Sequence, residues 1–203
     1  LGKEFVGNDD VGLILGDNIY YGNDLVKLLN IGVESAQKKS KATVYGYYVN
    51  EPQRYGVVLF DEQQNVISIE EKPSNPKSNF AITGLYFYPN NVLKKAEEVK
   101  PSKRGELEIT SINNMYLSEK NLKVEIMGRG YAWLDTGTHS SLLDAGNFVR
   151  TLTERQGLQF GSPDEVAYRS KWINKEQVAT SAKKFDKNAY GNYLKQLTKE
   201  HIL

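Results

Sequence analysis

The sequence predicts an α/β fold, with an α/β body over residues 1–140 and a C-terminal helical region over residues 141–203. In the body, short segments rich in β-branched and aromatic residues alternate with amphipathic segments of helical period. One short segment, Val11–Leu15, is almost entirely apolar, which is typical of parallel strands covered on both faces. After Gly157 the strand patterns stop, and only helical patterns with polar breaks continue.

The strands of the body are predicted from runs of β-branched, aromatic and other apolar residues. They are expected at Val11–Leu15, Ala42–Val49, Gly56–Phe60, Val66–Ile69, Ala81–Tyr88, Leu122–Met127 and Tyr131–Leu134. The polar stretch DEQQN, residues 61–65, separates the third and fourth of these segments and predicts a hairpin-like connection between them.

Helices are predicted where apolar residues recur every three or four positions. They are expected at Asp24–Gln37, Asn91–Val99, Glu106–Ser118 and Thr138–Arg155, with three more helical segments after Gly157. Pro101 ends the second of these helices, and Thr138 is placed to cap the fourth. Ser162 with Pro163, and Asn174, mark helix starts in the C-terminal region.

The composition narrows the classes of partner. The 203 residues carry 26 Lys and Arg against 25 Asp and Glu, so there is no basic surplus to bind nucleic acid or an anionic membrane. There is no cysteine, which excludes disulfides and cysteine chemistry and suits a cytoplasmic location. No apolar run approaches the ~18–20 residues that cross a bilayer. Small-molecule partners are therefore expected, with no nucleic acid and no membrane.

Two acidic residues stand at the ends of predicted strands. Asp17 follows Val11–Leu15 and Gly16, and Asp135 follows the strand that ends at Leu134. Ligands of open α/β sheets bind at the carboxyl ends of strands, and Mg²⁺ takes one or two carboxylates beside water and phosphate oxygens. Both acids also have an ordinary structural interpretation, Asp17 in an Asx turn and Asp135 as a helix cap. If the two strand ends meet, one metal ion can bridge them.

Three further stretches carry candidate ligand groups, although each also fits a plain structural role. Gly56 in RYGVV permits close approach of a ligand to the backbone, or simply forms a turn. Glu71 and Lys72 in IEEKP can bind sugar hydroxyls and a phosphate, or can be a solvated pair of charges. Arg104 in SKRGELEIT precedes a predicted helix N-terminus, where an anion binds favourably and where acidic residues also suit the helix dipole.

Taken together, the motifs resemble the sugar-nucleotide pyrophosphorylases, a nucleotidyltransferase family. The stretches LILGDNIYYG, RYGVV, EEKP, ITGLYFY, KPSKRGELEIT and GRGYAWLDTGTH occur in this order, and the similarity covers nearly the whole chain. They look most like the glucose-1-phosphate thymidylyltransferase branch, which SPDEVAYR in the C-terminal region also fits. The resemblance implies a Rossmann-like nucleotide-diphospho-sugar transferase core with a C-terminal helical tail.

The reaction that the resemblance implies joins dTTP to α-D-glucose 1-phosphate and yields dTDP-glucose and pyrophosphate. The dTDP-glucose is usually the precursor of dTDP-rhamnose and related deoxysugars. A sugar phosphate oxygen attacks the α-phosphorus in line, so positioning and charge neutralisation carry the rate. Mg²⁺ is the implied cofactor, with Asp17 and Asp135 as its ligands. The strand is then expected to end in a buried Asp17 because the metal offsets the cost of burial.

The family pattern also assigns side chains to the substrates. Lys72 and Arg104 are implied to neutralise the sugar phosphate as catalytic residues, and Glu71 to accept sugar hydroxyls. The other substrate-binding positions implied are Asn18 beside the metal ligand, Tyr55 and Gly56 in the sugar pocket, Ile82, Gly84 and Tyr86 on its wall, and Trp133 near the phosphates.

The resemblance further implies an assembly and a second site. Short enzymes of this type are usually homotetramers with a regulatory nucleotide site near the C-terminal helices. Glu165, Val166 and Arg169 are the candidates for that site, although a plain amphipathic helix explains the same residues.

One part of the family pattern has no counterpart in the sequence. The family begins with a strand and a Gly-x-Gly-Thr-Arg-Leu loop that cradles the triphosphate, and no such stretch occurs here. The first strands of the core are therefore expected to be missing, and the 203-residue chain alone to be inactive as a transferase. Val11–Leu15 is then expected to be an exposed apolar edge that associates with a second copy or another segment.

Two other functions stay open on the residues alone. A nucleotide-sugar-dependent glycosyltransferase uses a similar sheet, although such enzymes usually show Asp-x-Asp where this chain has Gly16-Asp17-Asn18. A non-catalytic module that binds a nucleotide sugar without turnover also agrees with the absent loop.

Overall fold

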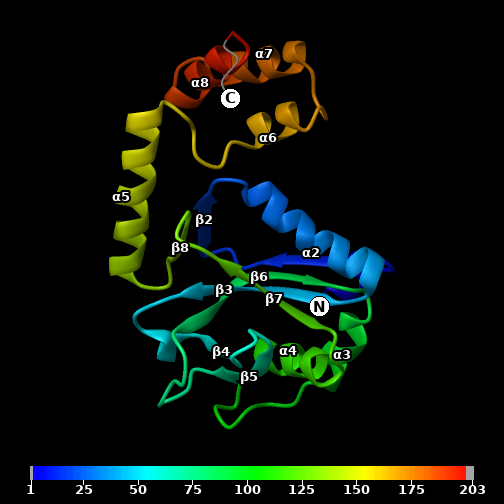
Figure 1. Cartoon of the computed structure of the whole chain (residues 1–203). Coiled ribbons are helices and arrows are strands. Elements are labelled where there is room, and N and C mark those ends of the chain that lie inside the picture. Colours follow the sequence, from blue (N-terminus) through cyan, green and yellow to red (C-terminus); the bar gives the residue numbers. More distant parts are fainter. Residues whose placement is uncertain (1, 200–203) are drawn as a thin grey trace. The chain divides into compact units, whose positions relative to one another are not determined.

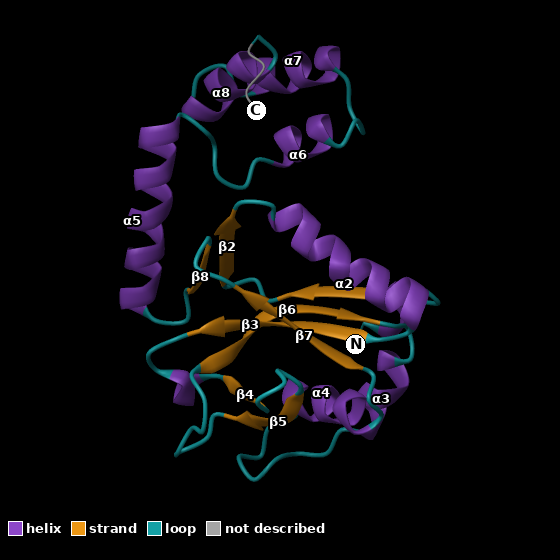
Figure 2. Cartoon of the chain, viewed as in Figure 1, coloured by secondary structure: helices purple, strands orange, loops and turns teal. Residues whose placement is uncertain are grey.

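The chain divides into two compact units between Thr136 and Gly137, and the computed structural model describes residues 2–199. The strands described all belong to the first unit, and the second unit is helical (Figure 2). The expected boundary at residues 140 and 141 lies inside α5, a helix that begins at His139.

The first unit contains eight described strands and four described helices, with a short 3₁₀ turn at Pro52–Arg54. The strands are β1 (Val11–Ile14), β2 (Asn18–Gly22), β3 (Ala42–Tyr48), β4 (Gly56–Phe60), β5 (Val66–Glu71), β6 (Phe80–Tyr88), β7 (Leu122–Met127) and β8 (Tyr131–Asp135). The helices are α1 (Lys3–Val6), α2 (Leu25–Lys39), α3 (Val92–Glu98) and α4 (Ile109–Ser118).

The main sheet of the first unit has six strands and is mixed. Its order is β5-β4-β6-β3-β7, and β1 pairs with the second half of β6, Leu85–Tyr88. The β3–β7 pair is parallel, whereas β6 runs antiparallel to β1, β3 and β4. A separate two-stranded sheet joins β2 to β8, so two segments more than a hundred residues apart in the sequence lie side by side.

Both faces of the main sheet are covered by helices, with α2 on one face and α3 and α4 on the other (Figure 1). The long apolar strands alternate side chains between these faces, which builds two cores. The core under α2 includes Leu28, Tyr45, Leu85 and Met127. The core under α3 and α4 includes Ala42, Val44, Val58, Ile69, Ile82, Tyr86, Tyr88, Val92 and Tyr116.

The second unit consists of α5 (His139–Gln156), α6 (Pro163–Arg169), α7 (Lys175–Lys184) and α8 (Ala189–Leu197). The predicted cap Thr138 is confirmed, since its hydroxyl accepts from the Ser141 N–H, and Ser162 and Asn174 cap α6 and α7 in the same way. Its core is formed by Val178, Ala182, Tyr193, Leu194 and Leu197. Within residues 2–199, no helix combines the length and apolar character that crossing a membrane requires.

The prediction for Val11–Leu15 is wrong in two respects. Strand β1 is antiparallel to β6, not part of a parallel pair. Its side chains are also largely exposed, with Leu13 at 37% and Ile14 at 57% of full exposure. The expected apolar edge is therefore present, because within the described residues β1 pairs with β6 alone.

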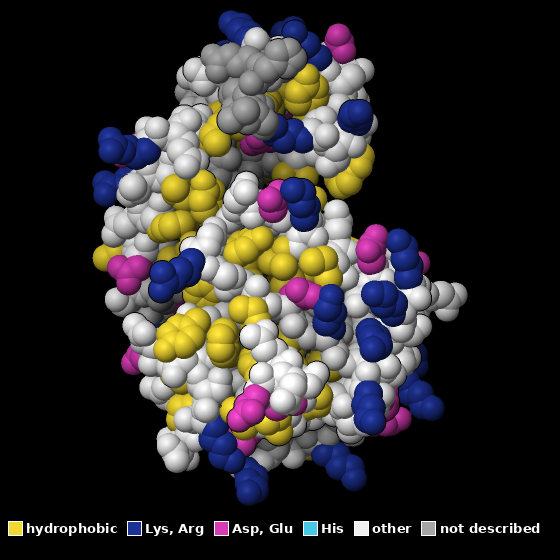
Figure 3. Space-filling view, viewed as in Figure 1, with side chains coloured by type: hydrophobic (Ala, Val, Ile, Leu, Met, Phe, Trp, Pro, Cys, Tyr) yellow, Lys and Arg dark blue, Asp and Glu magenta, His cyan; other side chains and the backbone are white. Residues whose placement is uncertain are grey.

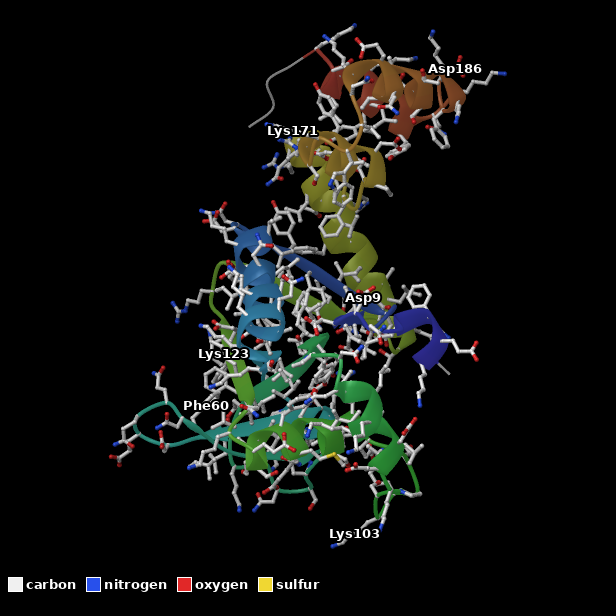
Figure 4. The ribbon with its side chains drawn as sticks, turned by 90° about the vertical axis from the view of Figure 1, so that its right-hand side faces the viewer. Asp9, Phe60, Lys103, Lys123, Lys171 and Asp186 are labelled. Atoms are coloured by element: carbon white, nitrogen blue, oxygen red, sulfur yellow. The ribbon has the colours of Figure 1, made fainter. Side chains whose placement is uncertain are left out.

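The expected helix at Glu106–Ser118 begins later, at Ile109. Residues 102–106 form a turn instead, in which the Ser102 N–H donates to the Glu106 carbonyl over 2.8 Å. Figure 4 shows Lys103 on this loop, ahead of α4. Arg104 therefore does not stand at the N-terminus of a helix, contrary to the sequence expectation.

Candidate functional site

A pocket of about 260 Å³ opens in the first unit where β6 passes the ends of β2 and β8. Its volume is just below the ~300–1,000 Å³ common for small-molecule sites. The lining residues are Leu15, Asp17, Asn18, Arg54, Tyr55, Gly56, Glu71, Lys72, Ile82, Gly84, Tyr86, Ile109, Thr110, Trp133 and Asp135.

Asp17 and Asp135 lie at the same end of the β2–β8 pair. Asn18 at the start of β2 lies opposite Asp135 at the end of β8. The Thr136 N–H and hydroxyl both donate to the Asp17 carbonyl, at 2.8 and 3.0 Å, which ties the two strand ends together. The two strand ends therefore meet, and both acids line one pocket, although Asp135 is part of the strand and does not follow it.

The stretch Leu15–Asn18 is a tight turn, because the Asn18 N–H donates to the Leu15 carbonyl over 3.1 Å. Asp17 lies in this turn and is exposed. The expectation of a buried Asp17 whose burial is offset by a metal is therefore wrong, since water solvates this carboxylate.

The Asn18 amide lies at the centre of a hydrogen-bond network. Its oxygen accepts from the Trp133 indole N–H at 2.6 Å, the Gly84 N–H at 3.2 Å and the Tyr20 hydroxyl at 3.3 Å. Its nitrogen donates to Oδ1 of Asp17 over 2.7 Å. The network thus joins the wall on β6 to the carboxylate in the turn.

The Asp135 carboxylate is held by Arg54 and Tyr55. The Tyr55 hydroxyl donates to Oδ1 of Asp135 over 2.7 Å, and Nη2 of Arg54 lies 3.5 Å from Oδ2. The Tyr55 ring also packs on Trp133, with ring centroids 5.0 Å apart. Burial, followed by the hydrogen bond to Asp135, raises the pKa of Tyr55 to about 12, so the phenol remains a donor at neutral pH.

Glu71 and Lys72 form the other end of the pocket. The Thr110 hydroxyl donates to Oε2 of Glu71 in a short contact, and Nη1 of Arg104 lies 3.9 Å from Oε1. Lys72 has a left-handed backbone with φ of 42°, and its N–H donates to the Tyr55 carbonyl over 2.9 Å. The carboxylate and the ammonium group therefore sit on one strand end beside the 54–56 segment.

The donor set suits a hard divalent cation. Two carboxylates, Asp17 and Asp135, face one pocket, and Mg²⁺ uses one or two carboxylates while water and phosphate oxygens fill its other positions. Among residues 2–199 no cluster of three or more His, Cys, Asp and Glu side chains is placed to hold a metal. A cation here would accordingly need oxygens from water or a phosphate substrate.

The pocket gathers most of the positions chosen from the sequence. Asp17, Asn18, Tyr55, Gly56, Glu71, Lys72, Ile82, Gly84, Tyr86, Trp133 and Asp135 all line it. Arg104 does not, because its guanidinium group pairs with Glu106 and Glu108 at 3.2 and 3.3 Å and reaches the site only through Glu71.

Four lining residues were missed by the sequence reasoning: Leu15, Arg54, Ile109 and Thr110. Each stands next to or inside a quoted motif, so adjacency to the chosen residues was the available signal. Thr110 in particular has no chemical signature in the sequence, and its role depends on the position of α4 against β5.

The candidate regulatory residues lie on α6 in the second unit. Nε of Arg169 donates to Glu165 over 2.7 Å, and the Tyr193 hydroxyl donates to the other oxygen of Glu165 in a short contact. Val166 is 55% exposed. Glu165 thus has intramolecular partners that stabilise the packing of α6 against α8.

The family model described as nucleotidyl transferase matches residues 1–151. The chain belongs to this family. Among curated relatives, the glucose-1-phosphate thymidylyltransferase of Neisseria gonorrhoeae is 51% identical over 197 residues, which cover 97% of this chain and 67% of that protein. The glucose-1-phosphate thymidylyltransferase of Mycobacterium tuberculosis H37Rv is 48% identical, with the same coverage.

Solved structures agree with this fold. A Bacillus anthracis protein described as a candidate glucose-1-phosphate thymidylyltransferase, in complex with sucrose, has a TM-score of 0.66 and 40% identity, covering 79% of this chain and 60% of that one. A UDP-glucose pyrophosphorylase complexed with UDP-glucose has a TM-score of 0.64, 23% identity and coverage of 74% and 59%, and shows the shared fold. The chain spans about two thirds of the curated relatives, as the 67% coverage of the Neisseria enzyme illustrates.

Proposed function

We propose that the protein containing this chain transfers a thymidylyl group from dTTP to α-D-glucose 1-phosphate, releasing pyrophosphate and forming dTDP-glucose. The observation that carries the proposal is one pocket that combines two carboxylates at a strand junction with a carboxylate, an ammonium group and a glycine-containing wall. The curated relatives named above bear the name of this activity.

In this proposal Asp17 and Asp135 hold Mg²⁺, which would neutralise phosphate charge as the α-phosphorus is attacked. Glu71, fixed by Thr110, accepts sugar hydroxyls, and Lys72 binds the sugar phosphate. Gly56, Ile82, Gly84 and Tyr86 form the wall against which the sugar ring lies. Tyr55 holds Asp135, and Trp133 closes the side toward the phosphates.

Arg104 enters the proposal as a second cation for the sugar phosphate. Its guanidinium group pairs with Glu106 and Glu108, so a phosphate has to compete with both for it. We also propose that the protein forms a homotetramer in the cytoplasm and that its dTDP-glucose supplies deoxysugar synthesis. A regulatory nucleotide site is proposed at Glu165, Val166 and Arg169. The near balance of 26 Lys and Arg against 25 Asp and Glu favours small-molecule partners over nucleic acid. The face in Figure 3 carries acidic side chains as well as basic ones.

The test of the sugar site is a calorimetric titration of the 203-residue chain with glucose 1-phosphate in the presence of Mg²⁺. We expect Glu71→Gln to weaken binding about tenfold or more, since hydrogen bonds to a charged group are lost. Glu70→Gln is the matched control, because Glu70 is the exposed neighbour on β5 and pairs with Lys77 at 3.9 Å. Equal binding by the two variants would place the sugar elsewhere.

The test of the reaction uses the full-length protein with dTDP-glucose and pyrophosphate. Release of dTTP supports nucleotidyl transfer, whereas a glycosyltransferase or a binding module releases none. We expect no release by the 203-residue chain alone, because its sequence has no Gly-x-Gly-Thr-Arg-Leu loop.

A further inference from the structure

We propose that Asn18 is a positioning residue, which fixes the side chain of Asp17 and is not itself free to bind a sugar hydroxyl through its oxygen. The proposal rests on the proposed function in one respect, namely that Asp17 is a ligand of a divalent cation. Its evidence is the set of donors that surround the Asn18 amide.

The orientation of the Asn18 amide is determined by its neighbours. The Trp133 indole and the Gly84 backbone present N–H groups, which donate and cannot accept. The atom that faces them must be the amide oxygen, and the NH₂ group must then face the Asp17 carboxylate, which accepts. The opposite flip would set an NH₂ group against two N–H donors and an oxygen against a carboxylate.

The amide oxygen has no lone pair left for a substrate. A carbonyl oxygen carries two lone pairs, and here three donors approach it within 3.3 Å, from Trp133, Gly84 and Tyr20. Burial raises the pKa of Tyr20 well above 10, so this hydroxyl remains a donor as well.

Gly84 permits this arrangement through its missing side chain. A Cβ atom at position 84 would lie 2.7 Å from Oδ1 of Asn18 and 2.8 Å from a methyl group of Leu15, both closer than real contacts. The close approach of Asn18 to β6 therefore depends on glycine at this position, which agrees with a fixed amide.

The hydrogen bond from Asn18 fixes the orientation of the Asp17 carboxylate. Asp17 is exposed and lies in a turn, where its carboxylate would otherwise rotate freely. The hydrogen bond from Asn18 holds Oδ1 toward the amide, and the other carboxylate oxygen keeps both lone pairs for a ligand in the pocket. Asn18 therefore links the sugar wall at Gly84 to the carboxylate that receives the cation.

The experiment is Mn²⁺ binding to the 203-residue chain, measured by the electron paramagnetic resonance of free Mn²⁺ without nucleotide or sugar. We expect Asn18→Ala to weaken Mn²⁺ binding about three- to tenfold, since the Asp17 side chain regains rotational freedom. Asn18→Asp keeps an oxygen for the three donors and places a second carboxylate beside Asp17, so it should tighten Mn²⁺ binding about fivefold or more.

Asn23→Asp is the matched control, because Asn23 also donates to an adjacent acid, Asp24, at an exposed position outside the pocket. It should leave Mn²⁺ binding within twofold of wild type.

The outcomes separate the positioning role of Asn18 from the proposed function. Unchanged Mn²⁺ binding in both Asn18 variants overturns the positioning role while the proposed function stands. Absence of Mn²⁺ binding by the wild type overturns the metal assignment in the proposed function, and the positioning role with it. If Asn18→Ala does not fold, Asn18→Asp carries the test, because it retains the acceptor for Trp133 and Gly84.

Discussion

At the scale of single residues, Lys72 shows how the site holds a strained backbone. Its φ of 42° lies in the left-handed region, which costs a residue with a Cβ roughly 1–2 kcal/mol. Pro73 follows it and restricts the conformations available to it further. Strain of this kind persists where the surrounding structure holds it, here the hydrogen bond from the Lys72 N–H to Tyr55.

We therefore predict that Lys72→Gly raises the free energy of unfolding by about 0.5–1 kcal/mol, since glycine adopts this conformation without strain. The same change should weaken glucose 1-phosphate binding about tenfold or more, because the ammonium group is lost. Urea denaturation and calorimetry measure the two quantities.

Lys120→Gly is the control for that prediction. Lys120 also has a left-handed backbone, with φ of 59°, but it does not line the pocket. It should gain stability without losing glucose 1-phosphate binding. A loss of stability in Lys72→Gly would contradict the assignment of strain to this residue.

At the scale of elements, β1 is the part of the sheet prepared for association. Within residues 2–199 it pairs with β6 alone, and Leu13, Ile14 and Leu15 are 37%, 57% and 41% exposed. An unpaired apolar edge is a template for another strand. We predict concentration-dependent self-association of the 203-residue chain in sedimentation velocity.

Ile14→Lys should reduce this association at least severalfold, because a charged residue on an edge strand opposes pairing. Val26→Lys is the control, since Val26 is 70% exposed but lies on helix α2 and not on β1. A monomer at every concentration, or equal effects of the two variants, would show that β1 is not the associating edge.

Strands and helix caps whose signal lies within a few neighbouring residues could be predicted from the sequence. Strands β3, β4, β6 and β7 end within about one residue of their expected bounds, and Thr138, Ser162 and Asn174 cap helices as predicted. Strand β2 was missed although Ile19, Tyr20 and Tyr21 favour a strand, because the run is short and its partner β8 is distant in sequence. The direction of β1 was also wrong, because an apolar run does not distinguish a buried parallel strand from an exposed edge.

The candidate site was predictable to the extent that its residues carry chemistry. Acids, a lysine and glycines in motifs could be chosen from the sequence, and they line one pocket. Residues that act by position could not, because Thr110 reaches Glu71 only through the packing of α4, and Arg104 is drawn to Glu106 and Glu108 by a turn that the helical pattern concealed.

At the scale of the whole molecule, tyrosine burial couples stability to alkaline pH. The chain has 13 tyrosines. Burial is the first cause that raises the pKa of Tyr86 and Tyr88 in the first unit and of Tyr193 in the second, above the ordinary value of 10.0. The folded state keeps these phenols protonated after the unfolded state has released their protons.

This difference in bound protons determines how the free energy of unfolding changes with pH. Above pH 10 the native state binds more protons than the unfolded state, so the free energy of unfolding falls as pH rises. The stabilisation is complete below pH 10 and is lost toward the higher pKa of the folded state. We predict a loss of about 1 kcal/mol between pH 9.5 and 11 for each fully buried tyrosine such as Tyr88.

Urea denaturation across this pH range measures the slope. Tyr88→Phe should lower stability at pH 8, because the hydrogen bond from Tyr88 to Asn113 is lost. It should also make the alkaline slope shallower, because one titrating group is removed. Tyr48→Phe, at a 60% exposed position, should leave the slope as it is. A slope that Tyr88→Phe does not change would mean that alkaline unfolding is driven by other groups, since a buried phenol with a raised pKa has to contribute to it.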